Sequence, residues 1–208
     1  DIVMATDPDA DRVGIAVKRK DGQWILLNGN QTASVLTYYL VNQWKLNNKL
    51  AGKEFIVKTI VTSELIKDIA ERNGVKSYDV LTGFKFIADK IKELEGKEVF
   101  IGGGEESYGY MIGDFVRDKD AVSTCAMIAE IASWAADNGK TFFDILVDLY
   151  CEYGFYKEDL LSITKKGKSG SEEIKQMMVN YRSNPPKEIA GSKVVMIKDY
   201  QLQKSQDL

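Results

Sequence analysis

The 208-residue sequence contains no histidine, and this absence removes several kinds of chemistry at once. A Ser-His-Asp triad, a histidine-ligated zinc site and imidazole acid–base catalysis all require a histidine side chain. Any proton transfer by this protein must therefore use Asp, Glu, Lys, Tyr or Cys.

Cysteine is almost as scarce. Cys125 and Cys151 lie in largely apolar, helix-like stretches, and no basic residue is placed to activate either thiol. Two cysteines form neither a disulfide framework nor a zinc site. A reducing compartment, the cytoplasm, is therefore expected.

Long apolar runs and an excess of basic residues are also lacking. No stretch is long enough to span a bilayer, so no membrane partner is expected. The formal net charge is -3 and the sequence pI is about 5.2, whereas a general nucleic-acid binder needs a basic surface. No nucleic-acid partner is therefore expected. The composition, 44% hydrophobic and 28% charged residues, is typical of a soluble globular protein.

Strand-like and helix-like patterns alternate between residues 28 and about 153. Short apolar runs at 54–61, 77–81 and 98–101 are each followed by a helical pattern. This order predicts an α/β fold with a mixed, mostly parallel sheet flanked by helices. Ligands of such sheets bind at the carboxyl ends of the strands, here residues 62–63, 82–85 and 102–109.

Two further regions flank this segment. Residues 2–5 and 13–17 are typical of buried strands. Residues 155–164 alternate like an exposed strand, residues 171–182 carry a helix signal with a capping box, and residues 194–197 are strand-like. This last part is typical of the start of another domain.

Three aspartates, Asp7, Asp9 and Asp11, alternate between the first two strand-like runs. On an extended segment alternate side chains point the same way, so the three carboxylates should converge. Clustered carboxylates favour a hard cation such as Mg²⁺ or Ca²⁺. An EF-hand is excluded, because Arg12 and Lys18 stand where it requires glycine and glutamate. Without a cation the same residues would form a solvated acidic turn.

A glycine-rich loop, residues 102–109, follows the strand-like run at 98–101. Glu105, Glu106 and Ser107 in this loop could hydrogen-bond to several sugar hydroxyls. The loop is not a P-loop, because no Gly-Lys-Ser/Thr follows. Adjacent glutamates on an extended segment point to opposite faces, which argues against a glycosidase pair. The alternative is a polar loop that caps the sheet.

Two smaller motifs lie at helix starts. Lys119, in the charged run 117–120, could contact a phosphate or transfer a proton, or could belong to a solvated charge run. Thr82, Gly83 and Lys85 lie at a strand-to-helix junction, which is either an anion site or an ordinary N-cap.

In this order the motifs resemble those of the α-D-phosphohexomutase family, the phosphoglucomutases and phosphomannomutases. Residues 5–12 resemble its metal-binding loop and residues 104–107 its sugar-binding loop. Residues 116–120 resemble the charged segment after that loop, and residues 81–85 a substrate-contacting turn. The form of residues 105–110 is most similar to the phosphoglucomutase/phosphopentomutase branch.

The resemblance implies a four-domain enzyme that interconverts sugar 1- and 6-phosphates, or pentose 1- and 5-phosphates, through a phosphoserine and a bisphosphate intermediate. It implies a sugar phosphate as substrate, a sugar bisphosphate as primer, and one Mg²⁺ held by Asp7, Asp9 and Asp11. Arg12 would support the phosphoserine site, and Lys119 would contact substrate or transfer protons. The substrate-binding residues implied are Glu105, Glu106, Ser107, Thr82, Gly83, Lys85 and Arg117.

Two segments of the family pattern are missing: Thr/Ala-Ser-His-Asn-Pro, the phosphoserine loop, and Arg-Pro-Ser-Gly-Thr, a phosphate loop. The resemblance therefore predicts an interior fragment, inactive alone, that requires the missing domains of its own parent chain. Residues 1–20 would end domain 2, residues 21–154 would form domain 3, and residues 155–208 would begin domain 4. Cut from their sheet, residues 1–18 are expected to be disordered, swapped in a dimer, or paired at an intermolecular edge.

Two other functions stay open. A non-catalytic sugar-phosphate-binding module would use the same Glu105 loop without chemistry. A Mg²⁺-dependent phosphatase with an aspartyl nucleophile is the other, because Asp7 and Asp9 follow a strand. The phosphatase gives no role to residues 105–107.

Overall fold

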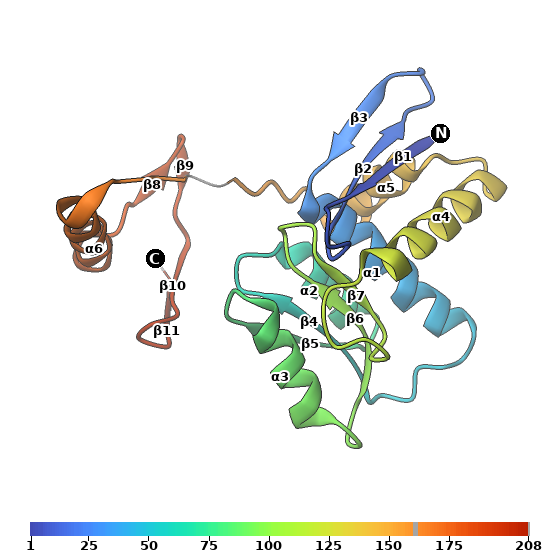
Figure 1. Cartoon of the computed structure of the whole chain (residues 1–208), viewed down its shortest axis with the longest axis horizontal. Coiled ribbons are helices and arrows are strands. Elements are labelled where there is room, and N and C mark those ends of the chain that lie inside the picture. The colour runs from blue at the N-terminus through green and yellow to red at the C-terminus, as the bar shows by residue number, and fades with distance from the viewer. Residues whose placement is uncertain (160–161, 208) are drawn as a thin grey trace. The chain divides into compact units, whose positions relative to one another are not determined.

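A computed structural model describes residues 1–159 and 162–207, and the chain divides into two compact units, Asp1–Glu158 and Asp159–Leu208 (Figure 1). The first unit contains the predicted α/β segment. Its four-stranded sheet has the order β5-β4-β6-β7, with β4 parallel to β5 and to β6. The prediction of a mixed, mostly parallel sheet is confirmed. The strands are β4 (Glu54–Thr59), β5 (Lys76–Val80), β6 (Val99–Gly104) and β7 (Tyr110–Ile112).

Capping side chains mark the starts of four helices in this unit. Asn28, Ser63, Asp120 and Thr141 each accept a backbone N–H in the first turn of a helix, which satisfies an otherwise unpaired donor. A capping side chain therefore sets each of these starts. The helices of this unit are α1 (Gly29–Leu46), α2 (Glu64–Arg72), α3 (Phe84–Leu94), α4 (Ala121–Asp137) and α5 (Phe142–Tyr153).

Side chains alternate across the central strand β4, and the two faces join different cores. Ile56 belongs to the large core with α1, α2, α4 and α5. Phe55 and Val57 belong to a smaller core with Ile87 and Ile91 of α3. Helices thus cover both faces of the sheet, and the carboxyl ends of β4 and β6 are left for loops.

A second, antiparallel sheet has the order β1-β2-β3, formed by β1 (Ile2–Thr6), β2 (Val13–Lys18) and β3 (Trp24–Leu27). The expectation that residues 1–18 are disordered is wrong, because they form β1 and β2, and β3 of the same chain pairs with β2. Val13, Ile15 and Val17 are also buried in the large core. Burial of alternate residues fixes the register of this sheet. Pairing of these strands at an intermolecular edge and the strand-swapped dimer stay predictions.

The second unit contains α6 (Gly167–Ser183) and two hairpins. Its helix begins at Gly167, earlier than the predicted Ser171, without a side-chain cap. The strand predicted at 155–164 is absent from its described residues, 155–159 and 162–164, because no described strand pairs with them. No helix of the described residues is long and apolar enough to cross a bilayer. The hairpin strands are β8 (Glu188–Ile189), β9 (Ser192–Lys193), β10 (Met196–Asp199) and β11 (Lys204–Asp207).

Candidate functional site

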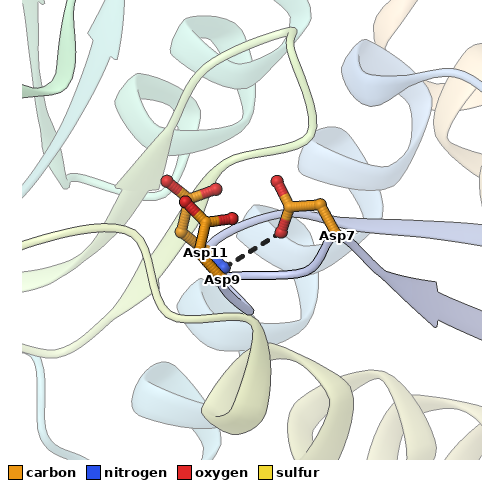
Figure 2. A group of neighbouring side chains, drawn as sticks. All are labelled: Asp7, Asp9 and Asp11. Atoms are coloured by element: carbon orange, nitrogen blue, oxygen red, sulfur yellow. Dashed lines mark hydrogen bonds between the residues drawn. The ribbon is translucent and has the colours of Figure 1, made fainter.

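The turn between β1 and β2 brings the three aspartates together. One carboxylate oxygen from each of Asp7, Asp9 and Asp11 lies within 4.8 Å of the other two (Figure 2). The predicted convergence is confirmed, but its predicted cause is wrong, because the segment is a tight turn rather than an extended strand. Asp7 Oδ1 accepts the backbone N–H groups of Asp11 (3.1 Å) and Arg12 (3.0 Å), and Ala10 has a positive φ of 56°.

Two cations neighbour this cluster. Arg12 Nε lies 2.8 Å from Asp7 Oδ2, and Lys119 Nζ lies 2.9 Å from Asp11 Oδ2. Hydrogen bonds from the Arg12 backbone and then its side chain hold the pKa of Asp7 well below its ordinary value. Asp7 is therefore ionised at neutral pH. Three carboxylates against two cations leave one net negative charge for a metal ion to meet.

Asp11 supplies a test of whether a metal fits. Its Oδ1 is buried and accepts no hydrogen bond from the described residues; Arg12 Nε is 3.3 Å away, in an ion pair without hydrogen-bond geometry. Mg²⁺ takes oxygen ligands at about 2.1 Å, so neighbouring ligand oxygens lie about 3 Å apart. From separations of up to 4.8 Å, the three aspartates would close by at most about 2 Å to reach that spacing. The donor set and the unsatisfied oxygen therefore fit a hard divalent cation.

The loop between β6 and β7 carries the predicted sugar-binding residues. Glu105 is buried, and its Oε1 accepts the backbone N–H of Gly83 at 2.9 Å. Its Oε2 lies 3.5 Å from Ser107 Oγ. Gly83 has a φ of 118°, a conformation that favours glycine. The structure thus brings the turn at residues 82–83 against the loop at residues 105–109, as the carboxyl-end rule predicts.

The same loop also pairs with the acidic turn. Arg12 and Gly109 form an antiparallel β-bridge, and the Val13 N–H donates to the Tyr108 carbonyl at 3.1 Å. This pairing joins segments far apart in the sequence and brings the acidic turn to the loop at residues 105–109. A hollow of about 330 Å³ results, lined by Ala5, Thr6, Asp7, Arg12, Gly14, Ser107 and Tyr108.

Lys119 lies at this site as a cation. Its Nζ contacts Asp11 and Asp118, and it lies 5.3 Å from the ring centre of Phe84. Burial lowers the pKa of Lys119, but the hydrogen bonds to both carboxylates outweigh it, and the pKa lies above its ordinary value. A lysine that acts as a base needs a lowered pKa, so this arrangement favours contact with an anion.

Two predicted residues are not brought to the aspartates. Arg117 pairs with Glu95 through contacts of 2.6 and 3.3 Å on the surface. Lys85 Nζ lies 4.9 Å from the ring centre of Phe86. To contact a substrate bound near the aspartates, these two side chains would have to change rotamer.

A polar group at the carboxyl end of β4 was not predicted from the sequence. Glu106 Oε2 accepts the hydroxyls of Thr59 and Thr62 at 3.1 and 3.0 Å. Beneath these threonines lies Lys58, which is fully buried. A lysine inside the apolar run 54–61 was the available signal, because lysine is rarely buried without a dedicated partner.

The backbone of Tyr108 is strained, and this gives a first prediction. Its φ is 71°, where a bulky side chain costs roughly 1 kcal/mol. The Tyr108→Gly variant should therefore be about 1 kcal/mol more stable than Tyr108→Ala, although both lose the same ring. Urea unfolding of the two variants measures the difference. Equal stabilities would show that the loop does not hold this conformation.

A model of the phosphoglucomutase/phosphomannomutase α/β/α domain III matches residues 28–153. A phosphoglucomutase of Staphylococcus aureus strain N315 is 43% identical over 201 residues, which cover 96% of this chain and 36% of that protein. The chain thus spans about a third of the length of the curated relatives it matches.

Two solved structures share the fold. Parafusin, a phosphoglucomutase of Paramecium, superposes with a TM-score of 0.64 at 19% identity, covering 99% of this chain and 34% of its own. An N-acetylphosphoglucosamine mutase of Aspergillus fumigatus, solved with GlcNAc-6P and magnesium, has a TM-score of 0.51 at 16% identity, covering 71% and 35%. At these identities the likeness establishes the fold alone.

Proposed function

Because the chain belongs to the phosphoglucomutase/phosphomannomutase family, we propose that it is part of an isomerase that moves a phosphoryl group between two hydroxyls of one sugar phosphate. The reaction would interconvert 1- and 6-phosphates of a hexose, or 1- and 5-phosphates of a pentose. One observation carries this proposal: the pairing of Arg12 with Gly109 joins the acidic turn to the loop at residues 105–109, and Asp7 and Ser107 line one hollow. A phosphorylated sugar has hydroxyls for the loop to bind and a phosphoryl group for a metal held by the carboxylates.

We further propose that Asp7, Asp9 and Asp11 hold one Mg²⁺. When bound, the ion would neutralise charge on the transferring phosphoryl group. Arg12 orients Asp7 through its side chain, and its guanidinium would support a phosphoserine supplied from outside these 208 residues. The magnesium in the Aspergillus fumigatus mutase supports this assignment of the metal.

The sugar would lie against the loop at residues 105–109. Glu105 accepts hydrogen bonds and Ser107 both donates and accepts, so this pair can bind vicinal hydroxyls in either orientation of a bisphosphate. Lys119 would contact the phosphate as a cation. Further contacts are proposed from Glu106, Thr82, Gly83, Lys85 and Arg117.

The coverage of the relatives supports a longer enzyme in which these residues form one part, and we propose that this enzyme is cytoplasmic. Residues 1–20 would complete domain 2, residues 21–154 would form domain 3, and residues 155–208 would begin domain 4. With a sugar bisphosphate as primer, these 208 residues alone should give no mutase turnover, because they contain no phosphoserine loop. A robust, primer-dependent rate from this chain would contradict the proposal.

Residue-resolved NMR tests the site directly. Titration of this chain with glucose 1-phosphate, then ribose 1-phosphate, in Mg²⁺ should give saturable shifts at Glu105, Ser107 and Lys119. A Glu105→Gln variant should lose those shifts, and an Asp21→Asn variant, altered on the surface, should keep them. No shifts at millimolar ligand, or shifts that survive Glu105→Gln, would refute the proposed sugar site.

A further inference from the structure

Lys58 is a fully buried cation at the carboxyl end of β4, outside every motif assigned above. Its Nζ lies 3.1 Å from Glu64 Oε1, 3.1 Å from Asp79 Oδ1 and 3.1 Å from the Thr62 carbonyl. The Thr59 carbonyl is 3.4 Å away. Removing an ammonium group from water is costly unless charges and hydrogen bonds compensate. The two carboxylates and two carbonyls around Nζ compensate this cost.

The two carbonyls that Lys58 binds belong to one tight turn. The Thr62 N–H donates to the Thr59 carbonyl at 3.0 Å, which closes the turn directly after β4. The hydroxyl oxygens of these threonines lie 2.7 Å apart, and both contact Glu106 Oε2. Two hydroxyl protons thus serve three short contacts among three oxygens. Lys58 fixes the turn from below, and the turn holds the Glu106 carboxylate above it.

Glu106 is held from the other side as well. A Cβ placed on Gly29 at the start of α1 would lie 1.7 Å from the Glu106 carbonyl oxygen, so helix and loop backbones are in close contact. Tyr110, which ends the loop, donates to the Gly29 carbonyl at 2.9 Å. Glu105 and Ser107 flank Glu106, so the direction of both depends on how Glu106 is fixed.

We propose that Lys58 is a positioning residue that acts through the turn at residues 59–62 on Glu106 and thereby aims Glu105 and Ser107 at sugar hydroxyls. The inference rests on the proposed function, since it assigns Lys58 to the same sugar site. Lys58 reaches the ligand only through the turn and the loop. Its loss should alter sugar binding and leave the metal cluster unchanged.

A Lys58→Met variant can separate this positioning role from a role in the stability of the fold. In a Lys58→Met variant the burial cost of the ammonium disappears, and an unbranched apolar chain fills the space. The freed carboxylates of Glu64 and Asp79 are partly exposed, at 40% and 26%, and can be hydrated. The carbonyls of Thr59 and Thr62 lose a buried donor, which loosens the turn. The fold should therefore persist while the loop shifts.

The test compares Lys58→Met with Thr62→Val, which removes one hydroxyl, and Thr62→Ser, which retains it. Without ligand, the backbone amide signals of residues 105–109 should shift in Lys58→Met and in Thr62→Val. In Thr62→Ser they should match those of the unaltered chain. Affinity for glucose 1-phosphate should fall about tenfold in the first two, while affinity for Mg²⁺ stays unchanged. The double variant Lys58→Met/Thr62→Val should bind no worse than either single one, because both act through one turn.

Unmoved loop amides in Thr62→Val, or a loss of Mg²⁺ affinity equal to that of sugar phosphate, would overturn the proposal. If Lys58→Met does not fold, the Thr62→Val and Thr62→Ser pair decides alone. If the unaltered chain does not bind glucose 1-phosphate, the proposed function fails. The amide comparison without ligand still decides whether Lys58 and its turn position the loop.

Discussion

Replacing Gly29 by alanine is expected to destabilise the protein, although alanine is the better helix former. By helix propensity alone, the change at the first residue of α1 would add up to about 1 kcal/mol of stability. The new Cβ would lie 1.7 Å from the Glu106 carbonyl oxygen and 2.5 Å from its carbon, however. A backbone carbonyl cannot rotate away as a flexible side chain can. We expect a loss of about 3 kcal/mol in the free energy of unfolding, measured by urea titration.

The same change should displace the sugar-binding loop, and with it the binding of glucose 1-phosphate. Gly14→Ala is the control, because it is the same substitution and no heavy atom lies within 4 Å of its added Cβ. This control should stay within about 0.5 kcal/mol of the unaltered chain. A Gly29→Ala protein as stable as the control would mean that α1 does not pack against residues 106–108.

Local signals predicted most elements of the first unit. Asn28 and Ser63 are capping residues in the sequence, and the helices begin directly after them. The antiparallel strand β7 escaped prediction, because its three residues are fixed by pairing with β6 rather than by their own pattern. The start of α6 escaped too. Gly167 and Gly170 lie in its first turns, and glycine weakens the local helix signal.

At the candidate site, too, some features could be predicted from the sequence and others could not. The sequence contains the carboxylates and the hydroxyl loop as recognisable motifs, but no local rule brings Arg12 to Gly109. That bridge depends on how the fold places the turn between β1 and β2 against the loop between β6 and β7. The convergence of the aspartates was predicted from an extended strand, whereas hydrogen bonds to Asp7 produce it. An extended strand and a tight turn can both bring alternate side chains to one side. Only the structure shows which of the two does so here.

Replacing Asp11 by asparagine is expected to remove most of the affinity for Mg²⁺. Asp11 carries a buried oxygen that accepts no hydrogen bond from the described residues, so a metal can bind it without breaking the turn. Asp7, by contrast, accepts two backbone N–H groups, and its loss would distort the loop. With asparagine, the cluster would keep two carboxylates against the two cations Arg12 and Lys119, and its attraction for Mg²⁺ would fall. We expect affinity to fall about tenfold or more, because ligand charge tunes such sites over decades.

Thermal unfolding with and without Mg²⁺ measures this effect. For the unaltered chain, Mg²⁺ at ten times its dissociation constant should add about 1.4 kcal/mol by mass action, and at the same concentration Asp11→Asn should gain well under half of that. Asp21→Asn is the control, since this carboxylate pairs with Arg19 at 3.2 Å in the turn between β2 and β3, outside the cluster. It should respond to Mg²⁺ like the unaltered chain. If Asp11→Asn is stabilised as strongly as the control, the three aspartates do not form the metal site, and their convergence serves the turn alone.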